Sequence, residues 1–227
     1  MKKIFYIVFF ANFAFFSFGA SAQDLSAICR KKMHNPKVTI TTSFGKLKYD
    51  NTKSRRAISR LHIEKGGKLL DGKLLNGIST FEHKASVEFK INKKTLPSGI
   101  YCYYPTEINI NIGAGNDPVI YIAKEFQKDS CLYNVTMRHE QTHQHINQSV
   151  LEYYAPIVKE RMLNVVQKYS VAGSKKNISL EQAKMSLQKR YMSELKILVE
   201  EIRKETAIEQ EKLDTVENYI HDESLCL

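Results

Sequence analysis

Two histidines and a glutamate in the middle of the chain have the spacing of a zinc site. Residues 137–145 read MRHEQTHQH and contain the pattern H-E-x-x-H, with His139, Glu140 and His143 at its defining positions. Each residue of an α-helix turns the chain by about 100°, so residues four apart lie on nearly the same face. Two imidazoles placed one turn apart are able to bind one zinc ion. The pattern therefore predicts a Zn2+ site on a helix.

Glu140 has the position of a general base. It lies about 100° around the helix from His139, too far to share the same coordination but close enough to reach a water on the metal. Zinc lowers the pKa of such a water, and a neighbouring carboxylate accepts its proton and passes it to the leaving amine. We therefore predict Glu140 as the catalytic residue of a zinc-dependent hydrolase. His145 is about 240° from His139 and is expected at the surface.

A catalytic zinc site needs a third protein ligand. The strongest candidates lie near the C-terminus, where Asp214, Glu217 and His221 have the spacing of one helical face. Glu217 is the preferred third ligand, because a carboxylate on a later helix is a common choice in such enzymes. His221 and Asp214 are the alternates; Asp214 would otherwise hold a ligand imidazole. Tyr219 could stabilise an oxyanion.

The N-terminus has the composition of a secretory signal peptide. Two lysines precede an apolar run rich in Phe over residues 4–18, and Ala20-Ser21-Ala22 provides a small-residue cleavage site. The run is too short for a stable transmembrane helix, and no later segment is apolar enough to span a bilayer. The expected organisation is a signal peptide over 1–22 and a single metallopeptidase-like domain over 23–227, without a transmembrane segment after cleavage.

The number of cysteines is typical of an exported protein. An even number of cysteines in an exported chain suggests disulfides, and this chain has four, namely Cys29, Cys102, Cys131 and Cys226. Of the three possible pairings we favour Cys102–Cys131 and Cys29–Cys226. No C-x-x-C pair is present, which disfavours a cysteine-ligated zinc site.

The charge and the sequons narrow the compartment and the partners. The net charge is +10, and about +8 once Lys2 and Lys3 leave with the signal peptide. Such a chain is attracted to anionic envelope surfaces, although an ordinary solvated face is the favoured explanation of the charge. We expect no nucleic-acid partner outside the cytoplasm. Glycosylation sequons at Asn134 and Asn147 flank the motif, where a glycan would crowd the site. This favours a bacterial protein, periplasmic or secreted.

The N-terminal half reads mainly as antiparallel sheet. Residues 36–50 read as a hairpin that turns at Ser43-Phe44-Gly45, and residues 52–64 as a short basic helix. Alternating or short apolar runs predict further strands at 85–91, 100–104, 106–112 and 119–123.

The C-terminal half reads as helical. The motif helix is expected over 134–154, and Pro156 kinks or ends it before a helical stretch over 157–169. Ser179 and Gln182 form a capping box at the start of a long helix that no Gly or Pro interrupts before the C-terminus. The predicted fold class is α+β, with an N-terminal sheet packed on a helical half that carries the H-E-x-x-H helix.

The segment Arg138-His139-Glu140-x-x-His143, after a short apolar strand in an exported chain, resembles the zincin metallopeptidases. It is similar to bacterial families described as secreted zinc-dependent proteases of unknown function. In these families a long helix and a C-terminal segment with an acidic residue and a further ligand follow the motif. The segment 213–219 lies at that place but lacks the Asp-x-x-Thr-x-His pattern of one such family. The specific resemblance covers the motif and little else.

Three classes of function follow from these observations. The first is a zinc peptidase that cleaves peptides or cell-wall peptides, or a peptidoglycan-directed amidase, with an extended substrate paired to a sheet edge such as 119–123. The second is a catalytically silent zincin-like envelope protein that binds metal or a partner. The third is a structural exported protein with a coincidental motif. Metal analysis and a digest with Glu140→Gln as control would separate the three.

Overall fold

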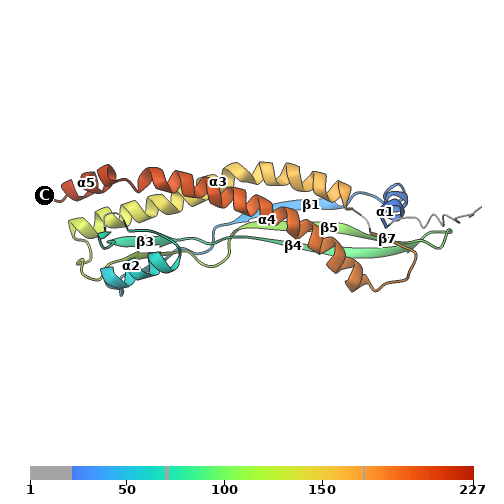
Figure 1. Ribbon diagram of the computed structural model, residues 1–227, viewed down its shortest axis with the longest axis horizontal. Helices are drawn as coiled ribbons and strands as arrows, with labels where there is room; N and C mark the ends of the chain where they lie inside the picture. The colour runs from blue at the N-terminus through green and yellow to red at the C-terminus, as the bar shows by residue number, and fades with distance from the viewer. Residues whose placement is uncertain (1–21, 70–71, 171) are drawn as a thin grey trace, which may run out of the picture.

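Two long helices lie side by side along two small β-sheets (Figure 1). The computed structural model describes residues 22–69, 72–170 and 172–227, so the predicted signal peptide lies outside the described residues except for its last position. The elements in chain order are α1 (Ala22–Arg30), β1 (Lys37–Ser43), β2 (Lys48–Asp50), α2 (Arg55–Glu64), β3 (Gly77–Thr80), β4 (His83–Thr95), β5 (Tyr101–Ala114), β6 (Val119–Ile122), α3 (Cys131–Lys168), β7 (Ala172–Ser174), α4 (Leu180–Leu213) and α5 (Val216–Ser224). The predicted α+β class is confirmed. No described helix is long and apolar enough to cross a membrane.

The larger sheet is built on the antiparallel hairpin of β4 and β5. Ile108, Ile110 and Ile112 are buried on one face of β5, whereas Asn109 on the other face is exposed, as their alternation predicted. Strand β1 pairs with β5 in parallel, and β7 pairs with the far end of β5 in antiparallel. The inner face of this sheet therefore offers a continuous apolar surface to the helices.

The hairpin predicted over 36–50 is wrong. β1 runs parallel to β5, while β2 runs parallel to β6 in the second sheet. The segment between β1 and β2 lies beside the segment between β5 and β6. The Lys48 N–H donates to the Pro118 carbonyl at 2.9 Å, and the Lys48 ammonium lies 2.9 Å from the Asp117 carboxylate. The second sheet has the order β2-β6-β3. Strand 119–123 is therefore its central strand and not the open edge that was expected.

Helices α3 and α4 cover the inner face of the larger sheet. The buried side chains that they contribute are Val150, Leu151, Val158, Met162, Val166, Leu187, Tyr191, Leu195, Leu198 and Ile202. Burial of each large apolar side chain stabilises the fold by about 1.5–3 kcal/mol, so this layer fixes both helices on the sheet. The N-terminal half of α3 continues beyond this core and contacts β3 and β6 of the second sheet. That half carries the H-E-x-x-H motif.

Pro156 does not end the motif helix, and α3 continues from Cys131 to Lys168. A proline removes one backbone hydrogen bond from a helix interior. Here Leu151 and Val158, one before and one after the proline, are almost fully buried in the core. Packing on both sides therefore keeps the two halves of the helix in one element.

The long C-terminal helix is interrupted, contrary to the prediction. α4 ends at Leu213, and α5 begins after Thr215. The Thr215 hydroxyl accepts a hydrogen bond from the Asn218 N–H at 3.2 Å, and the Asn218 side chain donates to the Leu213 carbonyl at 3.0 Å. These local bonds satisfy the end of one helix and the start of the next without Gly or Pro. Asp214 is left between the two helices.

The predicted disulfide pairing is also wrong. The bonds are Cys29–Cys102, which joins α1 to β5, and Cys131–Cys226, which joins the start of α3 to the residues after α5. α1 and α5 lie at opposite ends of the elongated molecule (Figure 1). A bond between Cys29 and Cys226 would have to span that length, whereas bonded cysteines have Cα atoms about 4.4–6.8 Å apart. Two disulfides are typical of an exported protein.

Candidate metal centre

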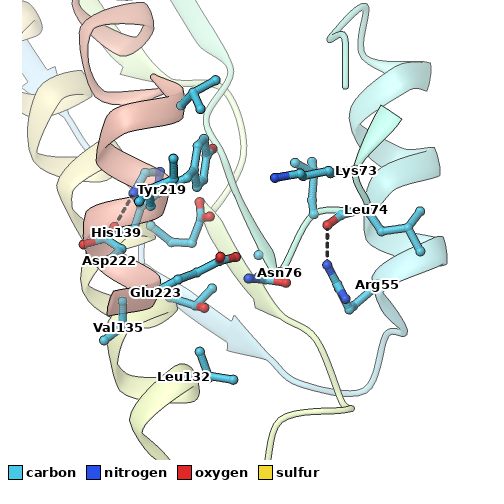
Figure 2. Close-up of a pocket in the computed structure, with 16 residues that line it drawn as sticks. Arg55, Lys73, Leu74, Asn76, Leu132, Val135, His139, Tyr219, Asp222 and Glu223 are labelled. Carbon is cyan, nitrogen blue, oxygen red and sulfur yellow. Dashed lines mark hydrogen bonds and ion pairs between the residues drawn. The ribbon is translucent and has the colours of Figure 1, made fainter. Parts of the chain in front are cut away.

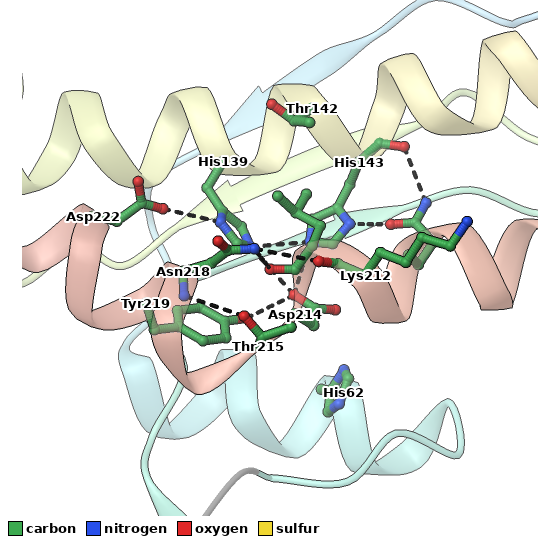
Figure 3. A network of polar contacts seen from close by, with 12 residues as sticks. His62, His139, Thr142, His143, Lys212, Asp214, Thr215, Asn218, Tyr219 and Asp222 are labelled. Atoms are coloured by element: carbon green, nitrogen blue, oxygen red, sulfur yellow. Dashed lines mark hydrogen bonds and ion pairs between the residues drawn. The ribbon is translucent and has the colours of Figure 1, made fainter.

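Helix α3 places His139 and His143 one turn apart on its buried face. Their side chains are part of a polar cluster between α3 and the junction of α4 and α5 (Figure 3). The two Nε2 atoms are 3.2 Å apart. The Asp214 Oδ1 atom lies 3.2 Å from the first and 3.1 Å from the second. Three donor atoms from residues far apart in the chain therefore form a nearly equilateral triangle.

The size of this triangle matches a tetrahedral zinc site. Ligand atoms about 2.0–2.1 Å from a tetrahedral zinc ion lie about 3.3 Å from one another. The sides of the triangle are 3.1–3.2 Å. In the described parts of the chain, no other set of three His, Cys, Asp or Glu side chains brings its donor atoms within 4.8 Å of one another. Two imidazoles and a carboxylate are also donors that zinc commonly takes.

The outer nitrogen of each imidazole faces an acceptor. The His139 Nδ1 atom lies 3.2 Å from the Asp222 carboxylate, and the His143 Nδ1 atom contacts the Gln210 side-chain oxygen. A neutral imidazole has one N–H and one lone pair. If both Nδ1 atoms carry the proton, both Nε2 lone pairs point into the triangle. This is the usual arrangement of metal-binding histidines, whose second N–H is held by a carboxylate or carbonyl oxygen.

Asp214 is held as a carboxylate. Burial raises its pKa, but hydrogen bonds from Tyr219 and, when the imidazoles are also protonated at Nε2, from His139 and His143 outweigh burial and bring the pKa well below its usual range. The Tyr219 hydroxyl donates to Asp214 Oδ1 at 2.8 Å, and its ring stacks on the His139 ring with centroids 5.0 Å apart. The hydroxyl predicted to stabilise an oxyanion is therefore bonded to the candidate ligand.

Glu140 is buried beside the imidazoles. It packs against β3, where a Cβ atom added to Gly77 would lie 2.9 Å from a carboxylate oxygen of Glu140. The backbone N–H of Ser79 donates a hydrogen bond to this carboxylate. Burial raises the pKa of Glu140 to about 7, against the lowering effect of His143 and His139. A carboxyl group in this environment is poised to exchange a proton near neutral pH.

The remaining predicted residues lie outside the triangle. Glu217, the preferred third ligand, and His221 are both exposed on α5. The third member of the triangle is Asp214, which was predicted as an alternate ligand. The helix break explains the difference, because the three residues do not lie on one continuous helix. His145 is exposed, as its position on the helix predicted.

Sequence reasoning missed Gln210 and Asp222. Gln210 lies one helical turn before Asp214. This four-residue spacing could have indicated that the two side chains lie on the same face of a helix. Asp222 had no such signal. Its position depends on the helix break and on the disulfide that holds the end of α5 against α3.

A cavity of about 110 Å3 opens beside His139 and Glu140, between α3, α5 and the segment that leads into β3 (Figure 2). Its position gives a ligand access to both side chains. Comparison of the chain with protein-family models, curated proteins and solved structures finds no match in any of the three. Function must therefore be inferred from the side chains themselves.

Proposed function

We propose that this chain is an exported zinc-dependent peptidase of the zincin type. His139, His143 and Asp214 hold the zinc ion, and Glu140 is the general base. The observation that supports this most strongly is the triangle of donor atoms with sides of 3.1–3.2 Å, next to the buried Glu140 carboxylate, which lines a cavity together with His139. When bound there, zinc would lower the pKa of a water molecule and polarise the scissile carbonyl.

The residues of the chain have distinct tasks in this mechanism. Glu140 accepts a proton from the attacking water and later donates it to the leaving nitrogen. The Ser79 N–H favours the charged form of the Glu140 carboxylate, which is the form that accepts a proton. Asp222 and Gln210 hold the outer nitrogens of the two imidazoles and direct their Nε2 atoms inward.

The substrate reaches the centre through the cavity. It does not pair as an added strand with the full length of β3. The Gln144 side chain donates to the Thr80 carbonyl at 3.2 Å, and Glu140 accepts from the Ser79 N–H. These bonds occupy polar groups of the second half of β3. We propose a peptide or cell-wall peptide as substrate and a bacterial periplasmic or extracellular site of action, which the disulfides support.

Zinc analysis of purified variants tests the ligand set. We expect one zinc per chain in the wild type and in Glu140→Gln and Glu217→Gln. His139→Ala and Asp214→Ala should each weaken zinc binding by 100-fold or more, measured by competition with a chromogenic chelator. Loss of zinc in Glu217→Gln together with full retention in Asp214→Ala would contradict this ligand set.

Digestion assays test the reaction. The wild type should cleave unstructured peptides in a mixed library, and Glu140→Gln, with zinc still bound, should not. A parallel digest of purified muropeptides would reveal an amidase. Zinc binding without hydrolysis of either substrate would instead favour a metal-binding envelope protein without catalysis.

A further inference from the structure

We propose that the cavity beside the metal centre binds a substrate side chain that ends in a carboxylate, and that Arg55 recognises this carboxylate. This inference rests on the proposed function, because it names the substrate class of the same site. The substrate is then a peptide with an acidic residue, such as glutamate, next to the bond that is cleaved.

The shape of the cavity suits one side chain with an aliphatic stem. Its apolar walls come from three elements: α3, α5 and the segment before β3, with Leu132, Val135, Val216, Ile220 and Leu74 as the main contributors. Its volume is about 110 Å3. A cavity of about 150 Å3 accommodates a benzene ring, so this one holds a single side chain of moderate size. Because His139 and Glu140 also line it, that side chain belongs to a residue beside the reacting bond.

Arg55 supplies an unused cationic donor in this cavity. Its Nη2 atom donates to the Leu74 carbonyl at 2.7 Å, which fixes the guanidinium at the wall (Figure 2). Its Nε–H is buried and has no hydrogen-bond partner in the described structure. The Glu125 carboxylate accepts from the backbone N–H of Arg55, and in the described part of the chain it makes no ion pair with the guanidinium. The guanidinium lines the cavity and carries a positive charge, so an anionic ligand would be stabilised here.

Asn76 provides the second contact. Its side-chain oxygen is buried without a partner, and Figure 2 draws the side chain between Glu223 and Arg55. The amide NH2 group is the donor that this residue offers to a ligand. A carboxylate bound against this wall would accept hydrogen bonds from the Arg55 guanidinium and from the Asn76 amide, both of which line the cavity.

The charged residues around the cavity favour one position for the ligand carboxylate. Arg55 and Lys73 lie on the side of α2 and the segment before β3, whereas Asp222 and Glu223 lie on α5. Asp222 is already occupied by His139. An acidic side chain is therefore attracted toward Arg55 and repelled from α5, and a lysine side chain would have the opposite preference.

Matched peptides test the specificity. A set of substrates that differ only in Glu, Gln, Leu or Lys on either side of the cleaved bond is assayed for kcat/KM. The same peptides are assayed for binding to zinc-loaded Glu140→Gln by fluorescence anisotropy. We expect the Glu peptide to exceed the Gln and Leu peptides by 10-fold or more in both assays. A Gln peptide equal to or better than the Glu peptide would overturn the proposal, because it would indicate an amide-binding site.

Variants of two neighbouring arginines test the assigned residue. Arg55→Gln should remove most of the preference for Glu, and Arg55→Glu should transfer it to the Lys peptide. Arg56→Gln is the matched control, since it removes the same charge from an exposed neighbour that does not line the cavity. An equal loss of preference in Arg56→Gln, or an unchanged preference in Arg55→Gln and Arg55→Glu, would overturn the proposal. Circular dichroism establishes that each variant is folded.

The two assays also separate this inference from the proposed function. Hydrolysis without any acidic preference overturns the inference and leaves the peptidase. Binding of acidic peptides that depends on Arg55, in a chain that neither binds zinc nor cleaves, supports the carboxylate site and overturns the peptidase.

Discussion

At the scale of single residues, Gly77 determines where the Glu140 carboxylate, the proposed general base, can lie. A Cβ atom at this position would approach Glu140 Cγ and Oε1 to 2.9 Å and Thr136 Cγ2 to 2.8 Å, which is closer than such atoms pack. In Gly77→Ala the Glu140 carboxylate must move. Since displacement of a reacting group by about 1 Å costs about 100-fold, we expect kcat to fall by that order, with zinc content unchanged.

Gly115→Ala is the control for this change. Its added Cβ would approach the Lys84 side chain to 3.2 Å, a contact that a shift of a few tenths of an ångström relieves, and Gly115 does not line the cavity. Steady-state kinetics and zinc analysis of both variants check the prediction. If Gly77→Ala keeps the full rate, Glu140 is not the base.

Asp222 is expected to act through His139 and not by touching the metal or the substrate. Its carboxylate holds the His139 Nδ1 atom at 3.2 Å. Asp222→Asn should weaken zinc binding by about 10- to 100-fold, which is the usual effect of losing such a partner. Glu217→Gln makes the same change of charge at an exposed position of the same helix and should leave zinc affinity unaltered. Equal affinities in the two variants would contradict this role.

The sequence predicted the part of the site that depends on local spacing. His139, Glu140 and His143 are within one helical turn and a half, so an ideal helix already defines their mutual directions. The third donor could not be chosen in the same way. Asp214 and Glu217 are equally plausible by residue type, and only the hydrogen bonds of Thr215 and Asn218, which end one helix and begin the next, separate them.

At the scale of elements, α5 depends on few attachments. None of its residues is buried, yet it contributes Tyr219 and Asp222 to the site. The Cys131–Cys226 disulfide connects its end to α3, and Cys131 is exposed. We therefore expect the variant with both cysteines changed to Ser to lose zinc affinity by 10-fold or more, because α5 no longer holds His139 and Asp214.

The Cys29–Cys102 bond provides a matched comparison. Its cysteines are fully buried at the other end of the molecule. Removal of either bond should lower the free energy of unfolding by a similar amount, about 4–5 kcal/mol in the chain-entropy model. Only removal of Cys131–Cys226 should change zinc affinity. Isothermal titration with zinc and urea unfolding of both double variants would detect the difference, and an equal loss of affinity in both would be evidence against it.

The start of α4 was predicted from a local signal, whereas the pairing of strands with distant partners was not. The capping box of Ser179 and Gln182 starts α4 as expected, because both of its hydrogen bonds are within four residues. β1 and β2 were predicted as a hairpin because they are adjacent in the chain. Their partners β5 and β6 are about 70 residues away, and no short pattern specifies parallel pairing over that distance.

At the scale of the whole molecule, α3 joins the structural core to the candidate site. Its C-terminal half is packed against α4 and the larger sheet, and its N-terminal half, with both histidines, lies over the second sheet. α4 runs back along it and brings Asp214 to the same end (Figure 1). The core therefore positions the three donor atoms, and its stability should control how well the centre is formed.

One buried histidine makes that stability depend on pH. His83 joins β4 to α4: its Nε2 atom lies 3.3 Å from the Thr206 hydroxyl, and Arg203 donates to its carbonyl at 2.9 Å. Burial and the Arg203 charge lower the pKa of His83 to about 4. An unfolded histidine has a pKa of about 6.5, so between pH 6.5 and pH 4 the unfolded chain binds the extra proton. Neutral His83 therefore makes its full contribution to the free energy of unfolding above pH 6.5. This contribution, at most about 3 kcal/mol, is lost as the pH falls toward 4. Urea unfolding of the His139→Ala/His143→Ala chain, with and without His83→Gln, isolates this residue; equal pH slopes in the two chains would refute the assignment.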